Sequence, residues 1–376
     1  MTTKPIRIDV NEQIECAFTL ASKFYVDPTV LEVEKDKIFR KTWQLVGTLD
    51  QVCGEVNGVK RTVADPESYF TAEIAGEPII VVRDKQGTLR TFSNVCRHRA
   101  GPIALGSGCK NVLRCQYHGW TYTLDGRLIG TPDVDGVEFF DRSTMGMVPV
   151  RVETWEKFIF VNFDANAEPL SAFLGEIPQQ ARGFHFEGLQ VAERRDYVID
   201  CNWKVYVDNY LEGYHIPIAH PGLMKEIDYA QYRTDTFRYH SQQFAPIRAM
   251  KQEDADQRFY APGAGLQEAL YFWIFPNLML NIYPDNISTN LILPLSTGKT
   301  LTIFEWFFHD MESEAIRERI KKAVAFSDEV QQEDIVLCEN VQKGLRSSTY
   351  DRGRYSVKRE NGVHHFHKLL GEFLGR

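Results

Sequence analysis

The sequence contains no hydrophobic run that approaches the roughly 20 apolar residues needed for a membrane-spanning helix. Segment 1–10 has no apolar core of the kind found in a secretory signal. Basic residues are not in excess, since the formal net charge is −8, whereas a nucleic-acid-binding or anionic-membrane-binding surface would be basic. We therefore expect a cytoplasmic protein without a nucleic-acid or membrane partner.

Nucleotide-binding loops and a disulfide framework are also missing. The sequence has no Gly-x-Gly-x-x-Gly and no P-loop, so we expect no built-in flavin or NAD(P)H domain. The seven cysteines are an odd number in a chain of 376 residues, which argues against a disulfide scaffold. Cysteines at short spacing to histidines in a cytosolic protein are more often metal ligands. Cys96 and Cys115 have this spacing.

Short strand patterns follow one another from about residue 43 to residue 163. Pro78–Val82 and Phe158–Phe163 have the composition of buried strands. Asp125-Gly126 gives a strong hairpin signal between two further short strands. We expect this part of the chain to form a small antiparallel β domain.

The rest of the chain mixes helix and strand patterns. Helical spacing occurs in 28–42, in 203–215, where Pro217 would end the helix, and in 313–346, a long charged helix that is either continuous or broken near Phe326. Strands are expected at 278–283, 286–294 and 301–308, the first two joined around Pro284-Asp285. Strands followed by a long helix predict an α+β domain.

Two short clusters each contain one cysteine and one histidine. Cys96-Arg97-His98 is followed, after 16 residues, by Cys115-Gln116-Tyr117-His118. Thiolate and imidazole ligands bind zinc or the iron of an iron–sulfur cluster. Zinc fingers pair Cys with Cys and His with His, whereas a Rieske centre has two thiolates on one iron and two imidazoles on the other. The mixed clusters therefore favour a Rieske centre over zinc.

A second candidate metal site begins with His215 and His220. These residues are five apart, so on a regular helix they would not share a face. Pro217 and Pro221 interrupt the helix, and a turn here could bring both imidazoles inward. The alternative is a surface turn in which neither histidine binds a metal.

A mononuclear iron site would also need a carboxylate. Asp334 lies within an apolar stripe of the late helix, together with Val330, Leu337 and Val341. A buried carboxylate is costly unless it is paired or binds a metal. Asp334 is therefore the best candidate, and Glu333 is the next.

These segments resemble the Rieske non-haem iron oxygenases of the ring-hydroxylating family. Segment 96–118, with Gly119-Trp120, resembles the Rieske signature, and segments 202–220 and 331–345 resemble the iron-binding segments of the oxygenase α-subunit. The resemblance covers nearly the whole chain. It implies a Rieske [2Fe–2S] domain at 43–163. It also implies a catalytic domain at 1–42 and 164–376, with an antiparallel sheet and covering helices of the helix-grip type.

The resemblance also implies the ligands. Cys96, His98, Cys115 and His118 would bind the [2Fe–2S] cluster. His215, His220 and Asp334 would bind mononuclear Fe(II), and Asn209 matches an asparagine that supports the iron site.

Glu212 is a departure from the aromatic-ring dioxygenases, which usually have Asp three residues before the first iron histidine. One helical turn from His215, its carboxylate could hydrogen-bond the free imidazole nitrogen. The resemblance adds a bridge to a Rieske histidine of a neighbouring subunit. Glu at this position resembles the branch that acts on quaternary ammonium compounds, although that branch often has Glu-Cys and this chain has Glu212-Gly213.

The implied enzyme is a terminal oxygenase that uses O2 and electrons from a separate NAD(P)H-dependent reductase, with or without a ferredoxin. It would work as a homotrimer and hydroxylate or N-demethylate a small organic substrate. An aromatic-ring hydroxylase or dioxygenase is the alternative, followed by a non-catalytic zinc-binding or electron-carrier protein. Six aromatic residues either fill the core or surround a cationic or aromatic substrate: Tyr271, Trp273, Phe275, Tyr283, Trp306 and Phe307. His364, His365 and His367 are expected on a helix surface or at an interface rather than at a metal.

Overall fold

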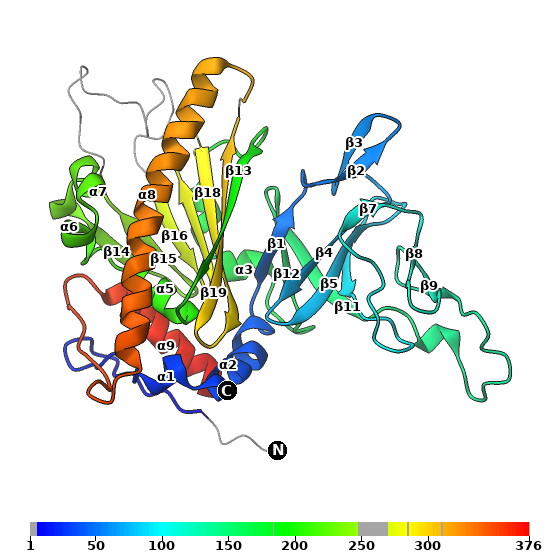
Figure 1. Ribbon diagram of the computed structural model, residues 1–376, viewed down its shortest axis with the longest axis horizontal. Coiled ribbons are helices and arrows are strands. Elements are labelled where there is room, and N and C mark those ends of the chain that lie inside the picture. The colour runs from blue at the N-terminus through cyan, green and yellow to red at the C-terminus, as the bar shows by residue number, and fades with distance from the viewer. Residues whose placement is uncertain (1–5, 183, 247–269, 284–285, 310, 376) are drawn as a thin grey trace. The chain divides into compact units, whose positions relative to one another are not determined.

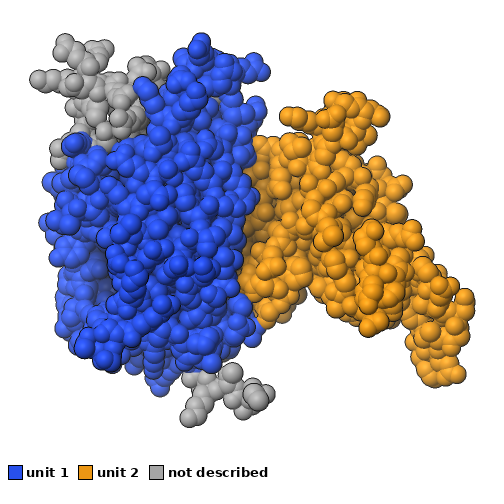
Figure 2. Space-filling view, in the orientation of Figure 1, with its two compact units in different colours: residues 1–38, 171–376 blue, residues 39–170 orange. Residues whose placement is uncertain are grey.

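The computed structural model divides the chain into two compact units (Figure 2). Unit 2 comprises residues 39–170, and unit 1 comprises residues 1–38 and 171–376, so unit 2 interrupts unit 1 in sequence. The structure describes residues 6–182, 184–246, 270–283, 286–309 and 311–375. Within these ranges no helix is both long enough and apolar enough to cross a membrane.

Unit 2 consists mainly of antiparallel strands, as predicted. Its main sheet has the order β1 (Gln44–Thr48), β12 (Phe158–Asn162), β11 (Pro149–Trp155), β6 (Leu89–Ser93), β5 (Glu77–Arg83), β4 (Ser68–Ile74) and β7 (Ser107–Cys109). A second sheet has the order β10 (Leu128–Gly130), β9 (Thr121–Thr123) and β8 (Val112–Arg114), and β2 (Val52–Val56) pairs with β3 (Val59–Thr62). A short 3-10 helix, η2 (Arg142–Thr144), precedes β11. The predicted hairpin at Asp125-Gly126 is confirmed, and Gly126 has φ +91°, which glycine adopts without strain.

Unit 1 is built around a seven-stranded antiparallel sheet (Figure 1). Its order is β13 (Gln190–Ile199), β19 (Lys299–Phe308), β18 (Asn286–Ser296), β17 (Leu278–Ile282), β16 (Leu270–Ile274), β15 (His240–Phe244) and β14 (Arg233–Thr236). The predicted pairing of 278–283 with 286–294 is confirmed by β17 and β18. The expected turn at 284–285 lies outside the described residues.

The long helix α8 (Glu314–Leu345) lies across one face of this sheet and contacts β13 and α5 (Trp203–Tyr210) (Figure 1). Ser313 caps its first turn by accepting a hydrogen bond from the Ile316 amide. The helix is continuous, so the alternative of a break near Phe326 is wrong. Val341 is half-exposed instead of lying on a buried stripe, because the buried side of this turn carries Cys338 and Gln342.

Shorter helices complete unit 1. They are α1 (Lys23–Val26), α2 (Pro28–Glu34), the π-helix η1 (Lys35–Phe39), α3 (Leu170–Leu174), α4 (Ile177–Gln180), α6 (Ile216–Ala219), α7 (Pro221–Glu226), the 3-10 helix η3 (Tyr229–Gln231) and α9 (Asn361–Gly375). The last residue of η1 and the first residue of α3 belong to unit 2. The predicted helix at 28–42 therefore ends earlier, as α2 followed by η1.

The expected surface position of the C-terminal histidines is wrong for His364 and His367. Both are buried on α9. His367 lies 2.9 Å from Asp208 Oδ1 through Nε2 and 2.6 Å from the Tyr355 hydroxyl through Nδ1. The polar partners of this imidazole are therefore inside the unit, which is why it can be buried.

An ion pair within unit 1 joins the N-terminal segment to α5. Lys204 Nζ lies 2.6 Å from Glu34 Oε1, and the Trp203 indole donates to Glu34 Oε2 at 2.8 Å. Burial lowers the pKa of Lys204, and the Glu34 carboxylate opposes this shift. Both charged side chains are fully buried, so removal of one partner would cost about 3–5 kcal/mol.

Candidate metal centres

The two loops of unit 2 bring the four predicted cluster ligands together. Cys96 and Cys115 are buried, whereas His98 and His118 are exposed, with ring centroids 4.5 Å apart. Burial raises the pKa of the Cys115 thiol, and the neighbouring Cys96 thiol raises it further. Two buried thiols beneath two outward imidazoles fit a cluster with one thiolate-bound iron and one imidazole-bound iron.

Neighbouring side chains fix the shape of these loops. The Tyr122 hydroxyl on β9 accepts a hydrogen bond from the Arg97 amide at 3.1 Å and lies 3.4 Å from Cys96 Sγ. The Trp120 ring stacks on His98 at a centroid distance of 5.0 Å. Gly119, with φ +73°, allows the chain to turn between His118 and Trp120. Tyr122 was not predicted, although its place in the hairpin after the second cluster was a usable signal.

In unit 1, α5 ends at Tyr210, so the predicted helix to His215 is wrong. The Glu212 carboxylate accepts hydrogen bonds from the Tyr214 and His215 amides, which replaces the helical pattern by a turn. Gly213 faces the Tyr232 ring so closely that a Cβ atom would lie 2.5 Å from it. A side chain at position 213 would therefore require the Tyr232 ring to shift.

This turn places the two predicted histidines at opposite ends of α6. His215 precedes the helix, and His220 follows it and directly precedes Pro221, the first residue of α7. Pro217 near the start of α6 suits a position where no amide donor is needed. The single helical turn of α6 thus directs both imidazoles to the same point.

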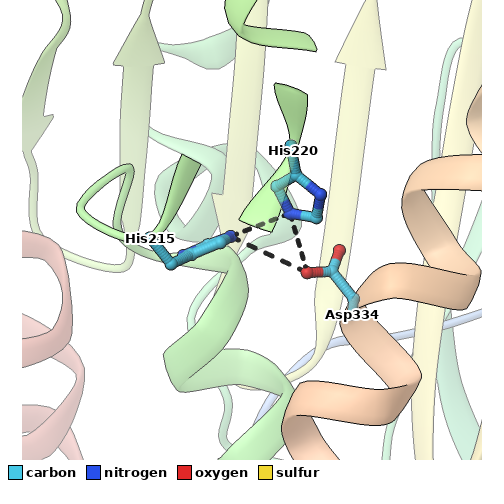
Figure 3. Close-up of side chains that lie close together, drawn as sticks. All are labelled: His215, His220 and Asp334. Atoms are coloured by element: carbon cyan, nitrogen blue, oxygen red, sulfur yellow. Dashed lines mark hydrogen bonds and ion pairs between the residues drawn. The ribbon is translucent and has the colours of Figure 1, made fainter. Parts of the chain in front are cut away.

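Asp334 of α8 completes this group (Figure 3). His220 Nε2 lies 3.1 Å from His215 Nε2 and 3.0 Å from Asp334 Oδ1, and His215 Nε2 lies 3.7 Å from Asp334 Oδ1. Ligands at right angles, with bonds of about 2.1 Å, would be separated by about 3 Å. The three donor atoms therefore fit one face of a metal's coordination sphere, as in a 2-His-1-carboxylate site.

Each of these three side chains is held by a further polar group. Glu212 Oε1 lies 2.5 Å from His215 Nδ1, as expected, and Asn209 Nδ2 donates to Asp334 Oδ1 at 2.7 Å. Glu333 Oε2 lies 2.6 Å from His220 Nδ1. Carboxylates on the outer nitrogens orient the imidazoles and fix their tautomers.

The position of Glu333 differs from its expected role as a substitute metal ligand. The Glu333 side chain points in a different direction from that of Asp334, because adjacent residues of a helix are about 100° apart around its axis. Glu333 therefore meets the outer nitrogen of His220, and Asp334 meets the inner one. Burial tends to lower the pKa of His220, but hydrogen bonds and charge from Asp334 and Glu333 raise it overall. The only sequence signal for the contact between Glu333 and His220 was that Glu333 directly precedes Asp334.

A cavity of about 180 Å³ adjoins His215, His220 and Asp334. Tyr271, Tyr283 and Trp306, three of the six aromatic candidates, line it, and the rings of the two tyrosines meet edge to face at 5.7 Å. The other three candidates, Trp273, Phe275 and Phe307, are buried in the core. The cavity therefore combines a metal-binding group with aromatic walls.

Comparison with known families agrees with both halves of this description. The Rieske [2Fe–2S] domain family matches residues 55–141, and the ring-hydroxylating α-subunit catalytic domain family matches residues 186–376. The chain belongs to the ring-hydroxylating Rieske oxygenase family. It is an oxidoreductase that incorporates oxygen from O2, and its family uses a Rieske [2Fe–2S] cluster, a mononuclear iron and a separate reductase. The alternative of a non-catalytic zinc or electron-carrier protein is wrong.

Relatives of this Rieske oxygenase align over nearly its whole length. Choline monooxygenase of Arabidopsis thaliana is 37% identical, covering 95% of this chain and 83% of its own. The carnitine monooxygenase oxygenase subunit of Acinetobacter baumannii is 32% identical, covering 96% of this chain and 95% of its own. The crystal structure of the quaternary ammonium Rieske monooxygenase CntA with L-carnitine has a TM-score of 0.82 at 30% identity, covering 99% of both chains.

Proposed function

We propose that this oxygenase hydroxylates or N-demethylates a small quaternary ammonium compound. The observation that carries the proposal is the position of the His215, His220 and Asp334 donor atoms at an aromatic-walled cavity. Relatives aligned over nearly the whole chain act on choline or carnitine. A quaternary ammonium ion cannot donate a hydrogen bond, so aromatic faces and nearby carboxylates are the groups that recognise it.

We assign the metal-binding roles as follows. The cluster ligands in the 43–163 domain are Cys96, His98, Cys115 and His118. The iron ligands in the domain formed by 1–42 and 164–376 are His215, His220 and Asp334. When bound, these groups supply one-electron storage and O2 activation. Asn209, Glu212 and Glu333 hold the iron ligands in place through the hydrogen bonds described above.

The cavity walls bind and orient the substrate. Tyr271, Tyr283 and Trp306 line the cavity and would surround a trimethylammonium group, and the Glu212 and Asp334 carboxylates line it on the metal side. An aromatic substrate would also suit such walls, and the preference for a cation rests on the relatives that act on choline or carnitine.

The overall reaction on an N-methyl group balances with the reductants the family uses. O2, two electrons and two protons convert N–CH3 to N–CH2OH and water. The resulting carbinolamine breaks its C–N bond, with loss of formaldehyde and a proton, and leaves the tertiary amine. Formaldehyde is therefore the diagnostic product of demethylation, whereas hydroxylation elsewhere releases none.

We further propose that electrons cross between subunits of a homotrimeric ring through Glu212. His98 and His118 are exposed on their unit, so a neighbouring chain can approach them. Inter-subunit electron transfer has been described for the related quaternary ammonium Rieske monooxygenase. A ring of head-to-tail contacts closes without leaving a free interface.

The test is substrate-dependent consumption of NADH by the holoenzyme with a separate reductase, with or without a ferredoxin. Choline, betaine, carnitine and a set of aromatic acids would be compared, and formaldehyde measured. We expect turnover with quaternary ammonium compounds and none when the reductase is omitted. Turnover with aromatic acids alone would establish the alternative, and sustained turnover by the chain alone would disprove the requirement for a reductase.

A further inference from the structure

We propose that the cavity selects a quaternary ammonium compound whose other end is an uncharged oxygen, such as a hydroxyl, and that Asn290 determines this specificity by donating a hydrogen bond to it. The inference rests on the proposed function and specifies its substrate class. It predicts discrimination against compounds of the same skeleton that end in a carboxylate.

A chain of hydrogen bonds fixes the orientation of Asn290. The Tyr210 hydroxyl donates to Asn281 Oδ1 at 2.7 Å. The Asn281 amide then donates to Ser288 Oγ at 3.1 Å and to Asn290 Oδ1 at 3.4 Å. The side-chain oxygen of Asn290 therefore already accepts a hydrogen bond. The side-chain nitrogen of Asn290, Nδ2, has no hydrogen-bond acceptor among the described residues.

The sheet holds this chain against the cavity. Asn281 on β17 is paired with Ser288 on β18, and Asn290 lies two residues further along the same face. Tyr210, Asn281 and Asn290 all line the cavity. Asn290 is only 7% exposed, so an unused donor there requires a ligand atom or water to satisfy it.

The described side chains around the cavity offer a carboxylate no cationic partner. Of the described residues that line it, none is Lys or Arg, whereas Glu212 and Asp334 are carboxylates. A buried carboxylate without a cationic partner is costly. A hydroxyl needs only a neutral hydrogen-bonding partner such as the Asn290 amide.

The experiment measures binding to the oxygen-free holoenzyme by isothermal titration calorimetry. Three ligands distinguish the contributions of the cation, the hydroxyl and the carboxylate. Tetramethylammonium has only the cation, choline adds a hydroxyl, and betaine has a carboxylate where choline has its hydroxymethyl group. We expect the natural protein to bind choline at least about tenfold more tightly than betaine. Asn290→Leu should weaken choline about five- to tenfold and leave tetramethylammonium unchanged.

A second variant keeps the site polar. Asn290→Asp retains an acceptor for the Asn281 amide but replaces the donor with a charged oxygen. Choline can donate its hydroxyl proton to that oxygen, so its binding should change only a few-fold, whereas betaine should become at least about tenfold weaker because like charges meet. Thr289→Val, on the opposite face of β18, is the matched control and should leave both affinities unchanged.

The outcomes separate the inference from the proposed function. Betaine binding as tightly as choline, or an equal loss of choline and tetramethylammonium in Asn290→Leu, would overturn the inference and leave the function intact. Failure of tetramethylammonium, choline and betaine alike to bind, together with no turnover of carnitine, would overturn the quaternary ammonium function itself, and the inference with it.

Discussion

In unit 2 the four candidate ligands come from two loops separated by 16 residues, whereas in unit 1 Asp334 lies 114 residues beyond His220. The unit 2 loops bring these four side chains together by themselves, with the two thiols buried and the two imidazoles exposed. The unit 1 site exists only when α6 and α8 are both in place. The first centre therefore depends on local loop geometry, and the second depends on the fold of the whole unit.

Loss of a ligand from the second centre should have the largest effect. Asp334→Ala removes the proposed carboxylate ligand, so we expect iron to fall from about three to about two per chain and turnover to be abolished. Iron analysis and the visible spectrum measure this, and the cluster absorption should be unchanged. Gln332→Ala, exposed on the same helix, is the control. Full activity in Asp334→Ala would move the third ligand elsewhere.

A ligand change at the first centre should alter the reduction potential of the cluster, and the cluster itself should still form. His118→Cys keeps four ligands, so a cluster should form, but its reduction potential should fall by roughly 300 mV because imidazole ligation raises the potential. Redox titration followed by absorbance measures the shift. Gln116→Ala, in the same loop, should leave the potential unchanged. Stoichiometric zinc without sulfide in the natural protein would refute the cluster itself.

Glu212→Gln tests whether the two centres communicate through this residue. Glutamine has a similar shape but lacks the charge and one acceptor, so both metals should still load. Transfer from the reduced cluster should slow by about 10- to 100-fold. Stopped-flow absorbance after addition of substrate and O2 would show a persistent reduced cluster. Reoxidation at the natural rate, or a fully active monomer, would place the route elsewhere.

Glu333→Gln should produce the smallest effect. The amide can still contact His220 Nδ1 but no longer stabilises the ring by charge, so iron affinity should fall about tenfold. Competition with a chelator measures the affinity, and the cluster spectrum provides the internal control. Unchanged iron affinity would mean that Glu333 does not support His220.

The difference between the centres also explains what could be predicted from the sequence. Cys96, His98, Cys115 and His118 lie in short motifs whose spacing already indicates a cluster. His215 and His220 were predicted, but the end of α5 at Tyr210 was not, because the Glu212 side chain and the Tyr232 ring determine it. The strands β17 and β18 were predicted from composition.

The contacts that depend on register between distant segments could not be predicted. Asn281 meets Asn290 because β17 and β18 pair in one particular register. His367 meets Asp208 across 159 residues of sequence, and nothing near either residue indicates the partner. Hydrophobic pattern predicts which face a residue takes, but a polar contact also requires the partner's position along the neighbouring element.

The buried pair of Glu34 and Lys204 has a consequence for synthesis on the ribosome. Glu34 is made 170 residues before its partner, which corresponds to a delay of roughly 10 to 30 seconds at typical translation rates. All of residues 39–170 emerge during that interval and can fold while the N-terminal helices wait. Synthesis of unit 1 thus begins before that of unit 2 and ends after it. A pause in translation before Lys204 should therefore prolong the exposure of α2 to chaperones and proteases.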